Sequence, residues 1–400
     1  MRLSTKSFGR DASSVAAAAL AGLKRTLVAA DLSDVLAGRP EAEAMDALRT
    51  LCGALDSRAT GVALSSLDLS DNALGEKGVR AAAAALTGQP GLLSLALQND
   101  GISEAAAAAL DELLPGQRAL TTLRLYNNMT GCGGAAHIAR LLSRCPGLTA
   151  LRVVSSRVGE AGGSALCASL APLASADLRT LDLCDNGLGA PTGAGLGAVA
   201  AAHTRLATLL LNETGLGDDG VVALCGGIAN HPSLARLELS CNEIGRKGAA
   251  ALAAALRTLK SLSALRVAEN EFGNEGAVAI AASLSPPPQS SKELAPLPPL
   301  VELDFSSCEM SGAGARAAGR AAAARRCGVL RLDGNAVGAA AVAAVRSRLL
   351  AAGLPPSALA PMEDNDDDGS DGEEEEEDGG AGGAGDGADG LDMGKASIAA

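Results

Sequence analysis

A nine-residue stretch that recurs along the chain is the feature that most limits how this sequence can fold. It reads LDLSDNALG from Leu67 to Gly75, and recognisable copies begin at nine later leucines. These are Leu95, Leu123, Leu151, Leu181, Leu209, Leu237, Leu265, Leu303 and Leu330. Successive copies start 28, 28, 28, 30, 28, 28, 28, 38 and 27 residues apart. Such a regular repeat predicts one array of similar units, because each unit buries its apolar face against its neighbours.

Within each copy the pattern changes from that of a strand to that of a helix. Leu67 and Leu69 alternate with polar residues, which is the period of a strand whose leucines face the core. Residues 76–87, EKGVRAAAAALT, are long enough for about three helical turns and end at a glycine. One strand and one helix per unit of this length indicates a leucine-rich repeat. We therefore predict an α/β leucine-rich-repeat solenoid, a ribonuclease-inhibitor-like horseshoe with parallel strands inside and helices outside.

Polar residues recur at two positions of the unit. Asparagine or a small polar substitute stands at the position of Asn72, in Asp100, Asn128, Ser156, Asn186, Thr214, Asn242, Asn270, Cys308 and Asn335. An amide there can bond backbone groups left unpaired where the strand ends, so we interpret this ladder position as structural. The strand residues between the leucines are predicted to line the concave face. All except Ala96 are charged among Asp68, Ala96, Arg124, Arg152, Asp182, Glu238, Arg266 and Asp304.

The negative charge of the chain is concentrated near its C-terminal end. The whole sequence carries −13, but residues 363–400 hold 15 acids and one lysine, which leaves +1 for residues 1–362. An acidic, glycine-rich segment cannot bury enough apolar surface to offset its ordering entropy. We predict about twelve repeat units over residues 1–354 and a disordered tail over residues 355–400. The tail has two interpretations, a solubilising segment or one that attracts a basic partner.

Signatures of other functions are absent from the sequence. It has no GxSxG, HExxH or GxxxxGK[ST] motif, and the GxGxG run at Gly193–Gly197 is expected at the start of a helix. Nine scattered cysteines without a CxxC pair indicate reduced thiols. We expect no cofactor, metal, nucleic acid or membrane insertion. The basic, Ser- and Ala-rich start also fits a transit peptide, and the proline-rich insertion at 285–299 is interpreted as a loop rather than a polyproline ligand.

Two residues depart from the repeat. The copy LSDVLAG from Leu32 continues past Gly38 into Arg39, where the next copy has Glu76, so Arg39 is predicted at the rim of the horseshoe. In LALQNDGIS, Asn99 falls one residue before the ladder position. From the repeat pattern alone, Arg39 is interpreted as a solvated arginine and Asn99 as a polar loop residue.

Four motifs change this interpretation, because together they resemble the Ran GTPase-activating protein family, most of all its plant and green-algal form. They are LSDVLAGRPEAEA at 32–44, LSSLDLSDNALGEKGVRA at 64–81, LALQNDGIS at 95–103 and YNNMTG at 126–131, with the acidic tail following. The resemblance covers roughly residues 3–378. It implies a regulator, not itself an enzyme, that stimulates GTP hydrolysis on Ran in trans and supports nucleocytoplasmic transport.

The resemblance also implies particular site residues. Asn99 matches the family's essential asparagine, which helps order Ran's own catalytic glutamine against the attacking water. Arg39, expected to be catalytic together with Asn99, matches the invariant arginine of a Gly-Arg pair, which does not act as an inserted finger. The residues expected to bind Ran-GTP from the strand-to-helix loops are Asp34, Asp71, Asp100 and Asn127.

Other family features are matched only in part. A Ran-binding protein in a ternary complex and a cytoplasmic, perinuclear location are expected from the resemblance. Pro40 and Glu41 follow Arg39 where other members carry a basic residue, as in the plant form. The WPP domain that carries plant members to the nuclear envelope is not matched, so that targeting is not carried over. The alternative is a non-catalytic leucine-rich-repeat interaction scaffold, which explains the period but not the joint occurrence of GRPEAEA, LQND and an acidic tail.

Overall fold

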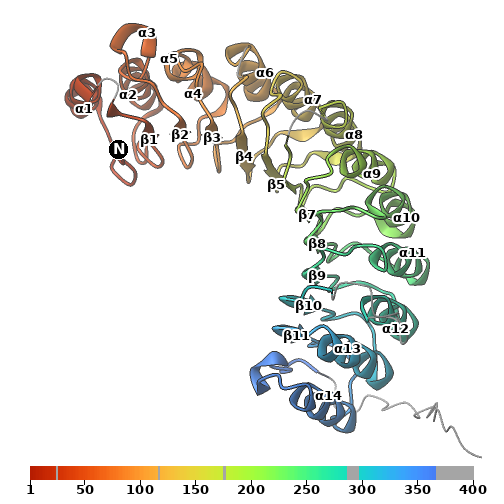
Figure 1. Ribbon diagram of the computed structural model, residues 1–400. Helices are drawn as coiled ribbons and strands as arrows, with labels where there is room; N and C mark the ends of the chain where they lie inside the picture. The colour runs from red at the N-terminus through yellow and green to blue at the C-terminus, as the bar shows by residue number, and fades with distance from the viewer. Residues whose placement is uncertain (24–25, 116–117, 174–176, 286–296, 366–400) are drawn as a thin grey trace, which may run out of the picture.

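The computed structural model is a curved solenoid whose units each place a strand on the concave side and a helix on the convex side (Figure 1). It describes residues 1–23, 26–115, 118–173, 177–285 and 297–365. Within these ranges, eleven strands form one parallel sheet in strict sequence order, from β1 to β11. The predicted fold, a leucine-rich-repeat solenoid with strands inside and helices outside, is confirmed.

The elements are short and regularly spaced. The strands are β1 (Ala29–Asp31), β2 (Ser66–Asp68), β3 (Ser94–Ala96), β4 (Thr122–Tyr126), β5 (Ala150–Val154), β6 (Thr180–Asp182), β7 (Thr208–Leu210), β8 (Arg236–Glu238), β9 (Ala264–Arg266), β10 (Glu302–Asp304) and β11 (Val329–Arg331). The helices are α1 (Arg10–Leu23), α2 (Glu41–Gly53), α3 (Ser57–Thr60), α4 (Gly75–Ala81), α5 (Ala83–Thr87), α6 (Glu104–Leu113), α7 (Gly131–Leu142), α8 (Gly159–Leu170), α9 (Thr192–Ala202), α10 (Gly217–Ile228), α11 (Arg246–Leu256), α12 (Gly273–Leu284), α13 (Gly312–Ala324), α14 (Ala339–Ala351) and the 3₁₀ turn η2 (Pro356–Ala358).

The leucines that begin the sequence copies are stacked in register through the sheet. Leu67 of β2 pairs with Leu95 of β3, which pairs with Leu123 of β4. The same register continues strand by strand to Leu330 of β11. All ten leucines are buried, so each unit covers the apolar face of the next.

Helices α9 and α10 pack tightly because glycines lie at their contact. A Cβ added at Gly193 of α9 would collide with the carbonyl oxygen of Gly220 in α10, and one at Gly227 would collide with that of Gly197. The two helices therefore approach each other backbone to backbone. This packing explains the GxGxG run at the start of α9 without any nucleotide-binding role.

The first unit is built from residues 1–23. Its strand is reduced to a bridge between Arg2 and Asp31 of β1. Its helix, α1, packs against α2, buries Leu20 completely, and pairs Arg10 with Asp46 at 2.8 Å. Counting this bridge as the first strand, the described chain contains twelve strand-helix units.

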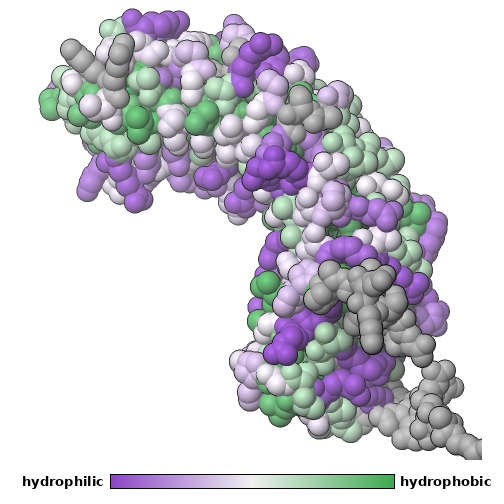
Figure 2. All heavy atoms as spheres, in the orientation of Figure 1, coloured by the Kyte–Doolittle hydropathy of each residue, from purple (hydrophilic) through white to green (hydrophobic). Residues whose placement is uncertain are grey.

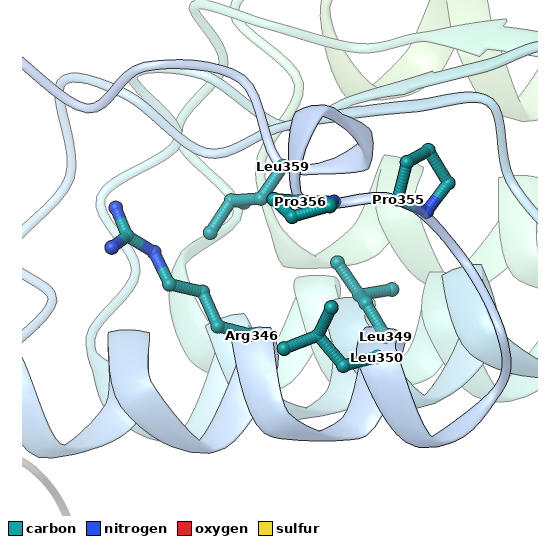
Figure 3. A pocket seen from close by; sticks show the side chains of 6 residues that line it. All are labelled: Arg346, Leu349, Leu350, Pro355, Pro356 and Leu359. Carbon is teal, nitrogen blue, oxygen red and sulfur yellow. The ribbon is translucent and has the colours of Figure 1, made fainter.

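The C-terminal end of the solenoid extends past the predicted boundary at residue 354. Leu359 forms a bridge to Leu330 of β11, and the backbone N–H of Ala360 donates to the Leu330 carbonyl at 2.9 Å. Leu359 faces Leu349 and Leu350 of α14 around a cavity of about 270 Å³ that Pro355 and Pro356 also line (Figure 3). Residues 355–365 thus cover the last unit, and the side chains of Ala358, Leu359 and Ala360 are buried there. The predicted tail from residue 366 on and the proline-rich insertion at 286–296 lie outside the described residues.

One predicted helix is interrupted. Residues 76–87 were expected to form a single helix, but α4 ends at Ala81 and α5 begins at Ala83. The N–H of Ala85 donates to the carbonyl of Ala82 at 3.0 Å, an i to i+3 bond that tightens the backbone at this point.

Candidate functional site

The predicted site residues lie at equivalent turns of neighbouring units. Asp34, Asp71, Asn99 and Asn127 each follow a strand and have left-handed backbone, with φ of 51°, 63°, 54° and 51°. Asp and Asn tolerate this conformation better than most residues, because their short polar side chains bond to nearby backbone. Asp71, Asn99 and Asn127 are exposed and Asp34 is half-buried. The fold therefore aligns these four residues along one rim of the horseshoe, at successive strand ends.

Three of these side chains form one hydrogen-bonded row. The amide nitrogen of Asn99 donates to the carboxylate of Asp71 at 2.6 Å. The amide oxygen of Asn99 accepts from the amide nitrogen of Asn127 at 2.8 Å. This arrangement fixes the direction of the Asn99 amide and still leaves one N–H and one lone pair facing solvent.

The backbone also holds the Asn99 turn. The N–H of Asn99 donates to the carbonyl of Tyr126 at 2.9 Å, and the N–H of Asp71 donates to that of Gln98 at 2.7 Å. Neighbouring turns are thus tied to each other as well as to their own strands. Asn99 is an exposed amide on a rigid support, which is the arrangement that a positioning group needs.

Asp100 does not fit the predicted binding role. It is fully buried, with 0% of its surface exposed, so it cannot contact a partner directly. One carboxylate oxygen accepts the N–H of Asn72 at 3.0 Å, in the ladder position that asparagine fills in other units. The assignment of Asp100 as a Ran-binding residue is corrected: it lies in the structural ladder beneath the rim.

The asparagine ladder itself is as predicted. The Asn72 oxygen accepts the N–H groups of Val35 at 2.9 Å and Leu36 at 3.2 Å, and its nitrogen donates to the carbonyls of Leu32 and Leu69 at 2.8 and 2.7 Å. Asn270 repeats the pattern seven copies later in the sequence. These residues satisfy backbone groups at the strand ends and are scaffold.

Arg39 lies at the rim, as predicted, but it faces the first unit and not Asn99. Its guanidinium donates to the Ser7 hydroxyl at 2.8 Å and to the Ser7 carbonyl at 3.2 Å, and it lies 3.7 Å from the Glu43 carboxylate. A Cβ at Gly9 would come within 3.0 Å of the guanidinium, so glycine allows this close approach. About a third of the Arg39 side chain, 35%, stays exposed.

Some charged residues of the concave surface are paired and others are not. In the C-terminal half, Glu302 of β10 accepts from Arg266 at 2.9 Å and from Arg331 at 3.1 Å. In the N-terminal half, Arg124 of β4 is exposed and forms no ion pair with any residue in the described ranges. The inner surface of the N-terminal arm, where hydrophilic side chains project in Figure 2, therefore has charge available for a partner.

Sequence reasoning missed two features of the rim. Ser7 holds Arg39 and Gly9 leaves room for its guanidinium, and both belong to a unit whose strand is a single bridge. Tyr126 and Met129 are 39% and 55% exposed, beside Asn127, and offer apolar contact area next to the polar row. The YNNM run contains both residues, but apolar residues in a repeat are ordinarily assigned to the core.

The described residues contain neither membrane spans nor metal clusters. In the described part of the chain, no helix has the length and apolar character to cross a bilayer. The same residues contain no group of three or more His, Cys, Asp or Glu side chains arranged to hold a metal ion.

Comparison with known proteins supports both the fold and the family resemblance. A leucine-rich-repeat family model matches residues 64–81, 230–253, 258–281 and 297–317. The fold is that of the leucine-rich-repeat proteins. A chain in the crystal structure of the Rad7 and Elc1 complex in yeast shares this fold, with a TM-score of 0.51 and 16% identity over 76% of this chain and 70% of that one.

The sequence relatives are more informative. The chain is 47% identical over 89 residues to RAN GTPase-activating protein 1 of Arabidopsis thaliana, and 54% identical over 83 residues to RAN GTPase-activating protein 2 of the same plant. The resemblance seen in the motifs is therefore confirmed. The matches cover 22% and 21% of this chain, and they span only 16% and 14% of the lengths of the two relatives.

Proposed function

We propose that this chain is a GTPase-activating regulator of Ran, which binds Ran-GTP at the N-terminal rim and accelerates its hydrolysis of GTP. The observation that carries the proposal is the 47% and 54% identity to two Ran GTPase-activating proteins. The exposed, fixed amide of Asn99 supports it, because a GTPase activator works by positioning and by stabilising charge. Such stimulation reaches about 10⁵-fold for a small GTPase, or roughly 7 kcal/mol of barrier.

In this proposal Asn99 is the group that touches the reacting partner. Its free N–H and lone pair can hydrogen-bond Ran's catalytic glutamine and hold it against the attacking water. Asp71 and Asn127 keep the amide in one orientation. Arg39, already held by Ser7 and Glu43, is assigned to the binding rim and not to the chemical step.

The experiment is single-turnover phosphate release from Ran-GTP with and without this protein. Asn99→Gly should lower the stimulated rate by at least about 100-fold, or ~2.7 kcal/mol, while leaving the urea unfolding midpoint unchanged. Glycine is the right replacement because Gly334 occupies the equivalent turn of the last unit, with φ of 69°. Glu269→Gly is the matched control, since Glu269 has the same turn conformation, φ 54°, far along the solenoid.

Two results would contradict the proposal. Full stimulation by the Asn99→Gly variant would remove Asn99 from the site. Binding of Ran-GTP without any stimulation by the unmodified chain would favour the alternative, a non-catalytic leucine-rich-repeat scaffold. A second small GTPase serves as the specificity control and should not be stimulated.

The remaining expectations about cellular context are also proposals. We propose that the protein acts in the cytoplasm, including the region around the nucleus, where hydrolysis of Ran-GTP would support nucleocytoplasmic transport. We further propose that a Ran-binding protein can join the complex. Microscopy of a fluorescent C-terminal fusion tests the location, and co-elution of three components in the presence of Ran-GTP tests the complex.

A further inference from the structure

Asp100, the residue after Asn99, occupies a position where the other units from Leu67 onward place a side-chain hydrogen-bond donor. In the units from Asn72 to Asn335, asparagine amides at this ladder position donate to strand carbonyls, as Asn270 does to Leu239 at 3.0 Å. The substitutes donate as well: the Thr214 hydroxyl to Leu211 at 2.8 Å, the Ser156 hydroxyl to Val154 at 2.9 Å, and the Cys308 thiol to Val267 at 3.2 Å. Only Asp100 would lack a donor there if it were ionised.

The carboxyl oxygens of Asp100 take the places of the side-chain amide oxygen and nitrogen of the ladder asparagines. Its Oδ1 accepts the N–H of Asn72 at 3.0 Å, just as the oxygen of Asn270 accepts the N–H of Asn242 at 3.0 Å. Its Oδ2 therefore takes the place of the amide nitrogen, which in the other units points at carbonyl oxygens. Oδ2 is buried and has no hydrogen-bond partner among the described residues. A carboxylate would present negative charge to carbonyls, whereas a carboxylic acid would supply the missing O–H.

The charged groups around Asp100 also oppose its ionisation. Asp68 and Asp71 of the preceding unit add negative charge near it, and from the following unit the neutral amide of Asn128 accepts its N–H. Burial, with these like charges adding to it, raises the pKa of the Asp100 carboxyl to about 8. At neutral pH the neutral acid is the main form.

We propose that Asp100 is a neutral carboxylic acid that completes the ladder and thereby positions Asn99 on the turn above it. Asp100 directly follows Asn99 in the chain, and its own backbone is held on both sides: its N–H donates to Asn128 at 3.2 Å and its carbonyl accepts from Gly75 at 2.8 Å. Ionisation forces the carboxylate away from the strand carbonyls and shifts this turn. Asn99 then loses its alignment with Asp71.

The first test does not involve a partner. An infrared difference spectrum between the unmodified chain and Asp100→Asn should contain the carbonyl stretch of a protonated carboxylic acid at pH 6 and lose it by pH 10. In urea unfolding, the sign follows from a folded pKa of about 8 and an ordinary value of 3.8. The stabilisation is complete below about pH 4 and is lost as pH rises through about 8. The unfolding midpoint of the unmodified chain should fall over that range more than that of Asp100→Asn.

The second test rests on the proposed function. Stimulated hydrolysis of Ran-GTP should fall about tenfold from pH 7 to pH 9, where about a tenth of Asp100 is still neutral, while Asp100→Asn keeps its pH 7 rate within about twofold. Asn270→Asp is the matched control: it should acquire pH-dependent stability without pH-dependent stimulation. Identical pH profiles for the unmodified chain and Asp100→Asn, or no protonated band at pH 6, would overturn the proposal. A chain that never stimulates Ran would instead refute the proposed function, and the infrared band would still decide the state of Asp100.

Discussion

At the scale of single residues, the rim shows how a repeat acquires a site without changing its fold. The turn before the ladder position is left-handed in unit after unit, so many residue types are carried there by the same backbone. Asn99 differs from its counterparts because Asp71 and Asn127 hold its amide from both sides. Orientation of the amide, and not the presence of an asparagine, is what distinguishes this turn.

Asp71 should therefore act on the partner through Asn99. Asp71→Gly removes the 2.6 Å hydrogen bond and should lower stimulated Ran-GTP hydrolysis about tenfold, or ~1.4 kcal/mol, comparable to a hydrogen bond to a charged group. The double variant with Asn99→Gly should be no slower than Asn99→Gly alone. Multiplying effects in this cycle would show instead that Asp71 contacts Ran independently.

The sequence predicted the positions of Arg39, Asn99 and their neighbours on the rim, because the period places each residue within its unit. It did not predict which of them touch. The contact of Arg39 with Ser7 depends on a first unit whose strand is a single bridge, and such a fragment has no periodic signal of its own. The burial of Asp100 was implicit in its ladder position, but an acid next to the asparagine predicted to act on Ran is easily taken for a binding residue.

At the scale of elements, the helix layer is specified by residues that have almost no side chain. Strands could be predicted from alternating leucines, and they pair in the expected register. Helix–helix contacts could not be predicted, because alanine and glycine give no sequence pattern that marks one face of a helix as the contact face. The backbone contact between α9 and α10 is visible only in three dimensions.

Two adjacent glycines of α10 test this contact. Gly227→Ala should destabilise the protein by more than about 2 kcal/mol, because its Cβ would collide with the Gly197 backbone. Gly226→Ala meets nothing within 4 Å and should stabilise the helix by about 0.5–1 kcal/mol. Urea unfolding monitored by circular dichroism measures both. Equal effects of the two substitutions would argue against close packing of α9 on α10.

At the scale of the whole molecule, the N-terminal units carry the candidate site and the C-terminal residues cover the end of the solenoid. The N-terminal arm carries the rim residues and Arg124, which forms no ion pair with the described residues, whereas Arg266 and Arg331 both pair with Glu302 further along. Residues 355–365 cover the last unit, and the Asn365 amide donates to the Val337 carbonyl at 2.5 Å. The solenoid thus has its own C-terminal cover before the acidic sequence begins.

The position of this cover indicates where the acidic tail can be removed without destabilising the solenoid. Deletion of residues 366–400 takes away 13 acids and one lysine, a net charge of −12, and leaves the cover in place. The unfolding midpoint should not change.

If the tail attracts a basic surface of the partner, its deletion should lower the association rate with Ran-GTP about tenfold at ~0.01 M salt and hardly at all near 1 M. The reason is that the screening length shrinks from about 30 Å to about 3 Å. Stopped-flow measurements across this range, with an equally long tail of Asn and Gln as the control, separate charge from length. A loss of rate that is independent of salt would show that the tail does not act by electrostatic attraction. If the rate does not fall at any salt concentration, the solubilising role remains as the interpretation of the tail.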